Sequence, residues 1–308
     1  MVNVIIPTYN RAELLPGAID SVLAQTFKDY EIIIIDDGST DGTRKVLSPY
    51  LLHPNIRYFY QDNKKQAAAK NLGIQKAQGE YIAFLDSDDL WSPQKLALQV
   101  KALDDHPEIA MVYSNQMIFR NSLDSGKIKY RPGILKSGEI FYDLLMRKFY
   151  CSTPTILLRK SAIDAVGGFD ESLRNALEDW EFTLRISKIF QIYCIDKPLI
   201  WRRIHAEGSP GYHEIRIRNH SRILDKYLSD SSLSDSFKKA VLGKAYFSWG
   251  HLSFLDRRYK KATRYFSKAT LNGHIGAFFA VGLCQLREVG RMIYLKLYNQ
   301  FFRSRFVN

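Results

Sequence analysis

The first hundred residues alternate short apolar runs with longer segments of helical periodicity. The apolar runs cover residues 4–6, 31–35, 57–60 and 81–85, and the helical segments cover residues 11–25, 43–51 and 66–76. Strands in such a βαβαβαβ order lie parallel, because each helix returns the chain to the same end of the sheet. We therefore predict an α/β fold with a mostly parallel sheet and helices on both faces.

Three of the apolar runs end in polar segments, at residues 7–10, 36–39 and 86–89. The carboxyl ends of parallel strands share one edge of the sheet, and ligands of such folds bind beyond that edge. We expect the three polar segments to line a single site.

The third segment is the most acidic, since Asp86, Asp88 and Asp89 fall within four residues. Carboxylates this close repel one another unless water, a cation or a metal offsets their charge. Oxygen ligands spaced as Asp-x-Asp suit Mg²⁺ or Mn²⁺, which keep water and phosphate in their coordination shell. The alternative is a solvated loop before a helix, with Ser92 as N-cap and Pro93 as the first helical residue.

The composition is that of a globular protein, with 308 residues and 46% hydrophobic content. Cys151, Cys194 and Cys284 lie far apart without a metal-type spacing, which favours a reducing, cytoplasmic setting. A charged segment followed by an apolar one is missing at the N-terminus, so we expect no secretory signal. No window of about 18 residues is apolar enough to span a bilayer, which predicts a soluble or peripheral protein.

The pattern changes twice along the rest of the chain. Apolar alternations at residues 110–113 and 155–158, a helix at 178–189 and a strand pair at 191–195 and 199–205 complete the first domain. Helical periodicity then continues to the end, so we predict a catalytic domain at 1–211 and a helical region at 212–308. Residues 242–269 resemble one tetratricopeptide-type hairpin, or form an ordinary α-hairpin.

The net charge of +12 is concentrated near the C-terminus, where residues 257–308 hold 11 Lys and Arg against one acid. Such a basic segment binds nucleic acid or an anionic membrane surface. Large apolar residues lie beside its cations and favour the membrane over nucleic acid: Met292, Ile293, Tyr294, Leu295, Leu297, Tyr298, Phe301 and Phe302. The alternative is a helix that packs its apolar face on the preceding hairpin. We expect peripheral attachment to the cytoplasmic membrane face.

The segments at residues 4–11, 33–43 and 84–89 together resemble the family 2 glycosyltransferases. The resemblance covers about residues 1–210. It implies the GT-A fold, a nucleotide-diphosphate sugar as donor and an inverting transfer.

The resemblance also implies a nucleotide site and a metal site. The nucleotide-sugar residues would be Pro7, Thr8, Tyr9, Asn10, Asp36, Asp37, Lys70, Asn71 and Asp86, and the metal residues would be Asp88, Asp86 and His205. Tyr9 is placed to stack on a base, and carboxylates at 36 and 37 suit uracil N3–H and ribose hydroxyls. The alternatives are a turn and helix cap for residues 8–10 and an Asx-turn for the two aspartates.

Several of these assignments have specific alternatives. Lys70 takes the place of the family's usual arginine, so it would neutralise a phosphate as a point charge or be an exposed helix cation. His205 resembles the histidine of an Arg-x-His pattern that completes the metal shell or touches the diphosphate, to which Arg203 would add charge. A lone histidine is otherwise structural.

Glu178 and Asp179 match the acidic pair that supplies the catalytic base in the family. An inverting attack needs a carboxylate within hydrogen-bond reach of the acceptor hydroxyl, and we assign this role to Asp179. The alternative is an acidic first turn that complements a helix dipole. The Gln-x-x-Arg-Trp pattern of processive synthases is missing around Trp201, which favours transfer of one sugar.

Together these features predict an inverting, metal-dependent, non-processive glycosyltransferase. It would move a sugar, expected from UDP, to a saccharide or lipid-linked acceptor in surface polysaccharide or glycan assembly. A nucleotidyltransferase is a weaker alternative, because residues 7–10 are not a glycine-rich phosphate loop. A non-catalytic helical binding module would leave the three polar strand ends unexplained.

Overall fold

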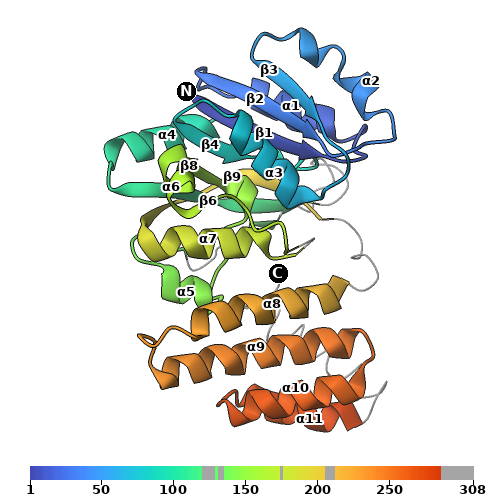
Figure 1. The fold of residues 1–308 in the computed structure, drawn as a ribbon, viewed down its shortest axis with the longest axis vertical. Helices are drawn as coiled ribbons and strands as arrows, with labels where there is room; N and C mark the ends of the chain where they lie inside the picture. The colour runs from blue at the N-terminus through green and yellow to red at the C-terminus, as the bar shows by residue number, and fades with distance from the viewer. Residues whose placement is uncertain (120–128, 131–134, 174–175, 205–211, 286–308) are drawn as a thin grey trace. The chain divides into compact units, whose positions relative to one another are not determined.

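The computed structural model describes residues 1–119, 129–130, 135–173, 176–204 and 212–285. The chain forms two compact units, Met1–Gly208 and Ser209–Asn308. Figure 1 shows the strands gathered in the first unit and only helices in the described part of the second.

The first unit contains a nine-stranded sheet whose strands follow the order β3-β2-β1-β4-β8-β6-β9-β5, with β7 paired to β6. The strands are β1 (Val2–Thr8), β2 (Tyr30–Asp36), β3 (Ile56–Tyr60), β4 (Tyr81–Phe84), β5 (Leu90–Trp91), β6 (Ile109–Phe119), β7 (Lys129–Tyr130), β8 (Ile156–Arg159) and β9 (Gln191–Arg203).

Seven α-helices and two short 3-10 helices are described in the first unit. The α-helices are α1 (Leu15–Leu23), α2 (Thr43–Leu47), α3 (Gln66–Lys76), α4 (Lys95–Asp105), α5 (Phe141–Leu145), α6 (Lys160–Val166) and α7 (Glu178–Ile189). The 3-10 helices are Tyr50–Leu52 and Thr153–Thr155.

Strand directions decide which loops meet. Strands β1 to β4 run parallel, β8 runs antiparallel between β4 and β6, and β9 runs parallel to β6. Two reversals cancel, so the carboxyl end of β9 lies at the same edge of the sheet as the carboxyl ends of β1, β2 and β4. The predicted α/β architecture is confirmed, and the antiparallel strands β5, β7 and β8 make the sheet mixed.

Both faces of the central strands are covered, as expected for parallel strands. Val4 and Ile6 of β1 belong to one buried cluster with Leu15 of α1 and Leu96 of α4. Ile5 points to the opposite face, where Gly73 lets α3 approach so closely that a Cβ there would be 2.4 Å from the Ile5 side chain. Burial of one such side chain stabilises the fold by about 1.5–3 kcal/mol.

The predicted strand pair at 191–195 and 199–205 is wrong, because the structure has the single long strand β9. Ser114 pairs with Ile195 and Asn115 pairs with Pro198, so Asp196 and Lys197 are extra residues in a bulge rather than a turn. A bulge keeps strand direction while it adds residues, and Pro198 is tolerated there because bulged residues leave the ladder.

The predicted helix start at Ser92 and Pro93 is also wrong, since α4 begins at Lys95 with Gln94 as its N-cap residue. Ser92 instead extends the pairing beside β5, where its N–H donates to the Leu199 carbonyl at 2.9 Å. Backbone pairing with β9 therefore replaces side-chain capping at this position.

The described part of the second unit is a series of helices, α8 (Tyr212–Leu228), α9 (Asp235–Leu255), α10 (Tyr259–Leu271) and α11 (Gly276–Gln285). The expected hairpin is present, because α9 and α10 pack through Gly250 and Phe266 and through the rings of Trp249 and Tyr265. Of the helices that the structure describes, none combines the length and apolarity needed to cross a bilayer. The tail at 286–308 lies outside the described residues.

We expect Gly73→Ala to destabilise the first unit by about 1–3 kcal/mol, because the new methyl group has no room beside the fully buried Ile5. Gly17→Ala in α1 is the matched control, since its Cβ would lie 3.5 Å from Leu90 in ordinary contact and the helix would gain propensity. Thermal unfolding followed by tryptophan fluorescence measures both. Equal melting temperatures for the two variants would contradict the packing argument.

Candidate active site

The polar segments that follow β1 and β2 are tied together by hydrogen bonds at the edge of the sheet. The Asp37 N–H donates to the Thr8 carbonyl at 2.9 Å, and the Asn10 N–H donates to Ser39 Oγ at 2.9 Å. The Leu85 N–H donates to the Ile5 carbonyl at 3.0 Å, and this hydrogen bond holds the chain after β4 beside β1 at the same edge. The predicted convergence of the three polar segments is therefore present.

The segment after β1 is shaped by Asn10, whose φ of 50° is left-handed. Asn10 Oδ1 accepts from the Thr40 N–H at 2.8 Å, so the loop-stabilising alternative holds for this oxygen. Pro7 is buried inside β1, whereas the Tyr9 ring is 46% exposed. Thr8 Oγ1 is buried without a hydrogen-bond partner among the described residues. Tyr9 and Thr8 are thus the side chains here that are free to meet a ligand.

Asp36 forms the Asx-turn that was the structural alternative for this residue. Its Oδ1 accepts from the Ser39 N–H at 2.9 Å, and its Oδ2 accepts from the Tyr58 hydroxyl at 2.9 Å. Burial, together with the Asp36 carboxylate, raises the pKa of Tyr58 to about 12, so this phenol remains a donor. Asp36 is 2% exposed and holds the turn, and its contact with the nucleotide stays a prediction.

Asp37 organises the chain between β3 and α3. Its Oδ1 accepts from Gln61 Nε2 at 2.7 Å and from the Lys64 N–H at 2.8 Å, and its Oδ2 accepts from the Lys65 N–H at 2.8 Å. The Lys65 φ of 78° accompanies this arrangement. The second oxygen keeps room for one more donor, such as a base N–H.

The three acidic residues after β4 have different surroundings. Asp89 is 3% exposed, and burial followed by the charges of Asp86 and Asp88 raises its pKa well above the usual range. It accepts from the Arg203 N–H at 2.8 Å and joins this loop to β9. Asp86 accepts from Gln66 Nε2 at 2.9 Å, and Asp88 lies 3.6 Å from the Arg11 guanidinium.

The pKa of Asp86 is raised, mainly by burial and also by the Asp88 charge, although Lys70 and Arg202 oppose the shift. A bound divalent cation would relieve this cost, so Asp86 and Asp88 fit the predicted metal. Among the described residues, no group of three or more His, Cys, Asp or Glu side chains could hold an ion alone. Two carboxylates suit an ion that keeps water and phosphate ligands. His205 lies outside the described residues.

Lys70 is 1% exposed, so the alternative of an exposed helix cation is wrong. Its ammonium group donates to Thr153 Oγ1 at 3.1 Å, lies 4.0 Å from Glu178 Oε1 and sits over the Phe169 ring at 5.1 Å. Burial raises the pKa of Glu178 to about 7, with Lys70 opposing the shift and Asp179 adding to it. Lys70 therefore compensates buried carboxylates beneath the site.

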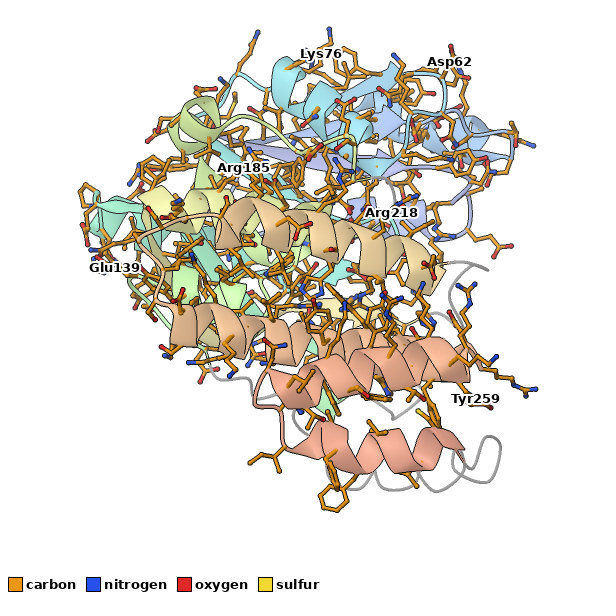
Figure 2. All side chains as sticks on the ribbon, turned by 60° about the horizontal axis from the view of Figure 1, so that its bottom comes forward. Asp62, Lys76, Glu139, Arg185, Arg218 and Tyr259 are labelled. Atoms are coloured by element: carbon orange, nitrogen blue, oxygen red, sulfur yellow. The ribbon has the colours of Figure 1, made fainter. Side chains whose placement is uncertain are left out.

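Asn71 has a structural task in the fold, and its contact with the nucleotide stays a prediction. Its Oδ1 accepts from the Phe169 N–H at 2.7 Å, and its Nδ2 donates to the Phe169 carbonyl at 2.9 Å and to Glu171 at 2.8 Å. Arg185 of α7, labelled in Figure 2, donates to the carbonyl oxygens of residues 166–168. The two side chains fix the loop that precedes α7.

Asp179 is presented by the first turn of α7, after Leu177 in a left-handed conformation with φ of 70°. Its Oδ1 accepts from the Trp180 N–H at 2.8 Å, and its Oδ2 accepts from the Tyr150 hydroxyl. The acidic first turn also complements the helix dipole, so this alternative holds, and the catalytic role of Asp179 stays a prediction.

The sequence predicted Arg203 as a cation for the diphosphate, and in the structure this side chain also has local partners. Arg203 Nε donates to the Asp88 carbonyl at 3.1 Å, and its guanidinium covers the Phe119 ring at 4.5 Å. Arg202, on the opposite face of β9, is a second cation besides Lys70 that opposes the rise in the pKa of Asp86. Period-two alternation separates the two arginines, but their faces depend on the bulge in β9.

The comparisons with known proteins agree with this geometry. The description Glycosyl transferase family 2 matches residues 3–167, which is more than half of the chain. An uncharacterized glycosyltransferase of Rickettsia felis is 50% identical over 206 residues, 66% of this chain and 33% of that protein. Chondroitin synthase of Escherichia coli is 31% identical over 234 residues, 74% of this chain and 33% of that protein. The chain thus spans about a third of the length of these relatives.

Solved structures share the fold. S. aureus TarS 1-349 in complex with UDP-GlcNAc has a TM-score of 0.64 at 18% identity, over 100% of this chain and 93% of that one. The mannosyltransferase PcManGT from Pyrobaculum calidifontis, in complex with GDP-Man and Mn²⁺, has a TM-score of 0.58 at 20% identity, over 97% and 87%. The predicted GT-A-like architecture is confirmed, and the matched residues carry the sheet edge described above. The chain belongs to glycosyl transferase family 2.

Proposed function

We propose that the chain is an inverting, metal-dependent glycosyltransferase that adds one sugar per encounter. The observation that carries the proposal is the meeting at one sheet edge of the carboxylates Asp86 and Asp88, the cation Arg202 and the carboxylate Asp179. Asp86 responds to the charges of all three others. One ligand that bears both phosphate and a reactive sugar carbon would use this whole set.

A nucleotide-diphosphate sugar is the donor class that fits. The exposed Tyr9 ring offers a stacking surface for a base, and Asp37 Oδ2 can accept from a uracil N3–H. The structural neighbours hold UDP-GlcNAc and GDP-Man, and the former supports a UDP-sugar. The acceptor class is a saccharide or a lipid-linked saccharide, in surface polysaccharide or glycan assembly.

The metal would be held by Asp88 and Asp86, with His205 as a further candidate ligand. Mn²⁺ or Mg²⁺ would neutralise the charge that builds on the departing diphosphate. Arg202 supplies a further positive charge that acts on Asp86, so the chain itself would offset part of the same charge.

Asp179 acts as the base in this proposal. The acceptor oxygen attacks the anomeric carbon, the bond from that carbon to the diphosphate oxygen breaks with its electron pair, and Asp179 takes the hydroxyl proton. The Trp180 N–H at 2.8 Å holds the carboxylate in place. Glu178 is 6% exposed and lies 4.0 Å from the Lys70 ammonium group, so its role is to balance the positive charge of Lys70 next to the base.

Attachment to the cytoplasmic membrane face is a further part of the proposal. Ile275, Phe278 and Phe279 of the second unit are 81%, 67% and 71% exposed, and residues 257–308 carry 11 cations against one acid. Exposed aromatic residues beside cations suit an anionic lipid surface.

A matched pair of variants tests the function. We expect Asp88→Asn to lower Mn²⁺-dependent binding of UDP-GlcNAc at least tenfold, about 1.4 kcal/mol, by removal of a metal ligand. Asp179→Asn should bind normally yet lose transfer by a factor of about 10²–10⁴ because it lacks the base. Calorimetry measures binding, and release of UDP measures turnover.

Glu139→Gln, an exposed change, is the control for both variants. Normal turnover by Asp179→Asn would refute the assignment of the base. Unchanged metal-dependent binding by Asp88→Asn would refute the metal site.

The buried Glu178 makes stability depend on pH. Its folded pKa of about 7 exceeds the ordinary 4.5, so the folded state holds the extra proton and loses about 3 kcal/mol of stability as pH rises from 4.5 through 7. Glu178→Gln removes this loss, so its melting temperature should rise relative to wild type between pH 5 and about pH 8. A constant difference across that range, as expected for Glu139→Gln, would contradict the raised pKa.

Liposome co-sedimentation tests the membrane proposal. The intact chain should bind vesicles with phosphatidylserine, whereas a chain truncated after Leu286 with Phe278→Ser and Phe279→Ser should not, because apolar anchors and cations are both removed. Equal binding by the two proteins would exclude this segment as an anchor.

A further inference from the structure

Among the described residues, Tyr150 is the side chain whose hydroxyl donates a hydrogen bond to Asp179 Oδ2. It belongs to the segment between α5 and the 3-10 helix Thr153–Thr155, far from every motif that the sequence analysis used. Tyr150 lies 29 residues before Asp179 in the sequence. Its contact with the proposed base is therefore a product of the tertiary fold.

The hydrogen bond has a fixed direction. Burial, followed by the Asp179 charge, raises the pKa of Tyr150 well above its usual range, and Glu178 adds to this while Arg202 opposes it. The phenol is protonated at neutral pH and donates to the carboxylate. A neutral hydroxyl that donates to Oδ2 is the same kind of partner as the sugar hydroxyl that Asp179 would deprotonate.

The segment around Tyr150 is anchored on both sides. The Arg147 guanidinium lies over the Trp180 ring at 5.4 Å, and Phe149 stacks on Tyr113 with centroids 6.0 Å apart. Ser152 Oγ donates to Gln116 Oε1 at 3.2 Å. The neighbours of Tyr150 are therefore held in place, so the hydroxyl would leave Asp179 by a movement of the Tyr150 side chain itself.

We propose that the Tyr150 hydroxyl occupies, before the acceptor binds, the place on Asp179 Oδ2 that the acceptor hydroxyl takes during transfer. Tyr150 is then a positioning residue that marks the acceptor subsite and keeps water from the base. The inference rests on the proposed function. It adds the location of the acceptor hydroxyl and a reason why the donor survives until the acceptor arrives.

Water is the reactant that such a guard excludes. In the unwanted reaction, a water oxygen bonds to the anomeric carbon and its proton passes to Asp179. The bond from that carbon to the diphosphate oxygen breaks, and the electron pair leaves with the nucleoside diphosphate. The products are the free sugar and the nucleoside diphosphate, so atoms and charge balance without a further reactant.

Tyr150→Phe tests the proposal through donor hydrolysis, with UDP-GlcNAc, Mn²⁺ and no acceptor. The variant keeps the ring and loses the hydroxyl, so we expect release of UDP to rise about five- to tenfold, the worth of one hydrogen bond. A purely structural role would lower the rate instead. The double variant Tyr150→Phe with Asp179→Asn should return to background, because the gain passes through the base.

Tyr142→Phe is the matched control, since this tyrosine of α5 is 53% exposed and should leave hydrolysis unchanged. Normal binding of UDP-GlcNAc by Tyr150→Phe with hydrolysis equal to or below wild type would overturn this inference alone. Failure of wild type to bind UDP-GlcNAc in calorimetry would overturn the proposed donor and the inference with it.

Discussion

The site depends on the interactions of one buried cation, the ammonium group of Lys70. It joins α3 to α7 because it lies within 4.0 Å of Glu178 and donates to Thr153. A buried carboxylate without such a partner would be too costly to keep ionised. A lysine fits this position because its ammonium group is a compact point charge that needs only the Phe169 ring, 5.1 Å away, and one hydroxyl group as neighbours. The planar, forked guanidinium of arginine is not required there.

Near Lys70 and Glu178, some polar side chains of the predicted site stabilise the loops, and others remain exposed to a ligand. The side-chain oxygens of Asp36, Asn10 and Asn71 accept hydrogen bonds from backbone N–H groups of turns and of Phe169, so these residues stabilise the loops around the site. Tyr9, which is 46% exposed, is the member of the predicted nucleotide set whose side chain reaches solvent. The division follows from burial, since a polar atom removed from water needs a protein partner.

Local sequence was sufficient for the parallel half of the sheet and for the acidic edge. The runs at residues 32–35 and 81–85 are continuous in β-branched and apolar residues, and a strand buried on both faces requires that composition. It was insufficient around Pro198, where a turn-like tripeptide is a bulge, and at Ser92, where a cap-like pair extends a strand. In both places a distant strand supplies hydrogen bonds that outweigh the local preference.

The sequence by itself determined the family and the α/β class, and it predicted Asp86, Asp88, Glu178 and Asp179 as the acidic groups of the site, because motif order and strand periodicity can be read along the chain. Only the tertiary structure decided which of these groups are buried and which groups oppose them. The placing of Lys70 in the interior, of Arg202 beside Asp86 and of Tyr150 on Asp179 depends on segments far apart in the sequence, from 29 residues for Tyr150 and Asp179 upward, being brought within hydrogen-bond or Coulomb range. These contacts and the burial around them cause the pKa shifts at the site. Burial and long-range charge are sums over the whole fold, and no local stretch of sequence contains them.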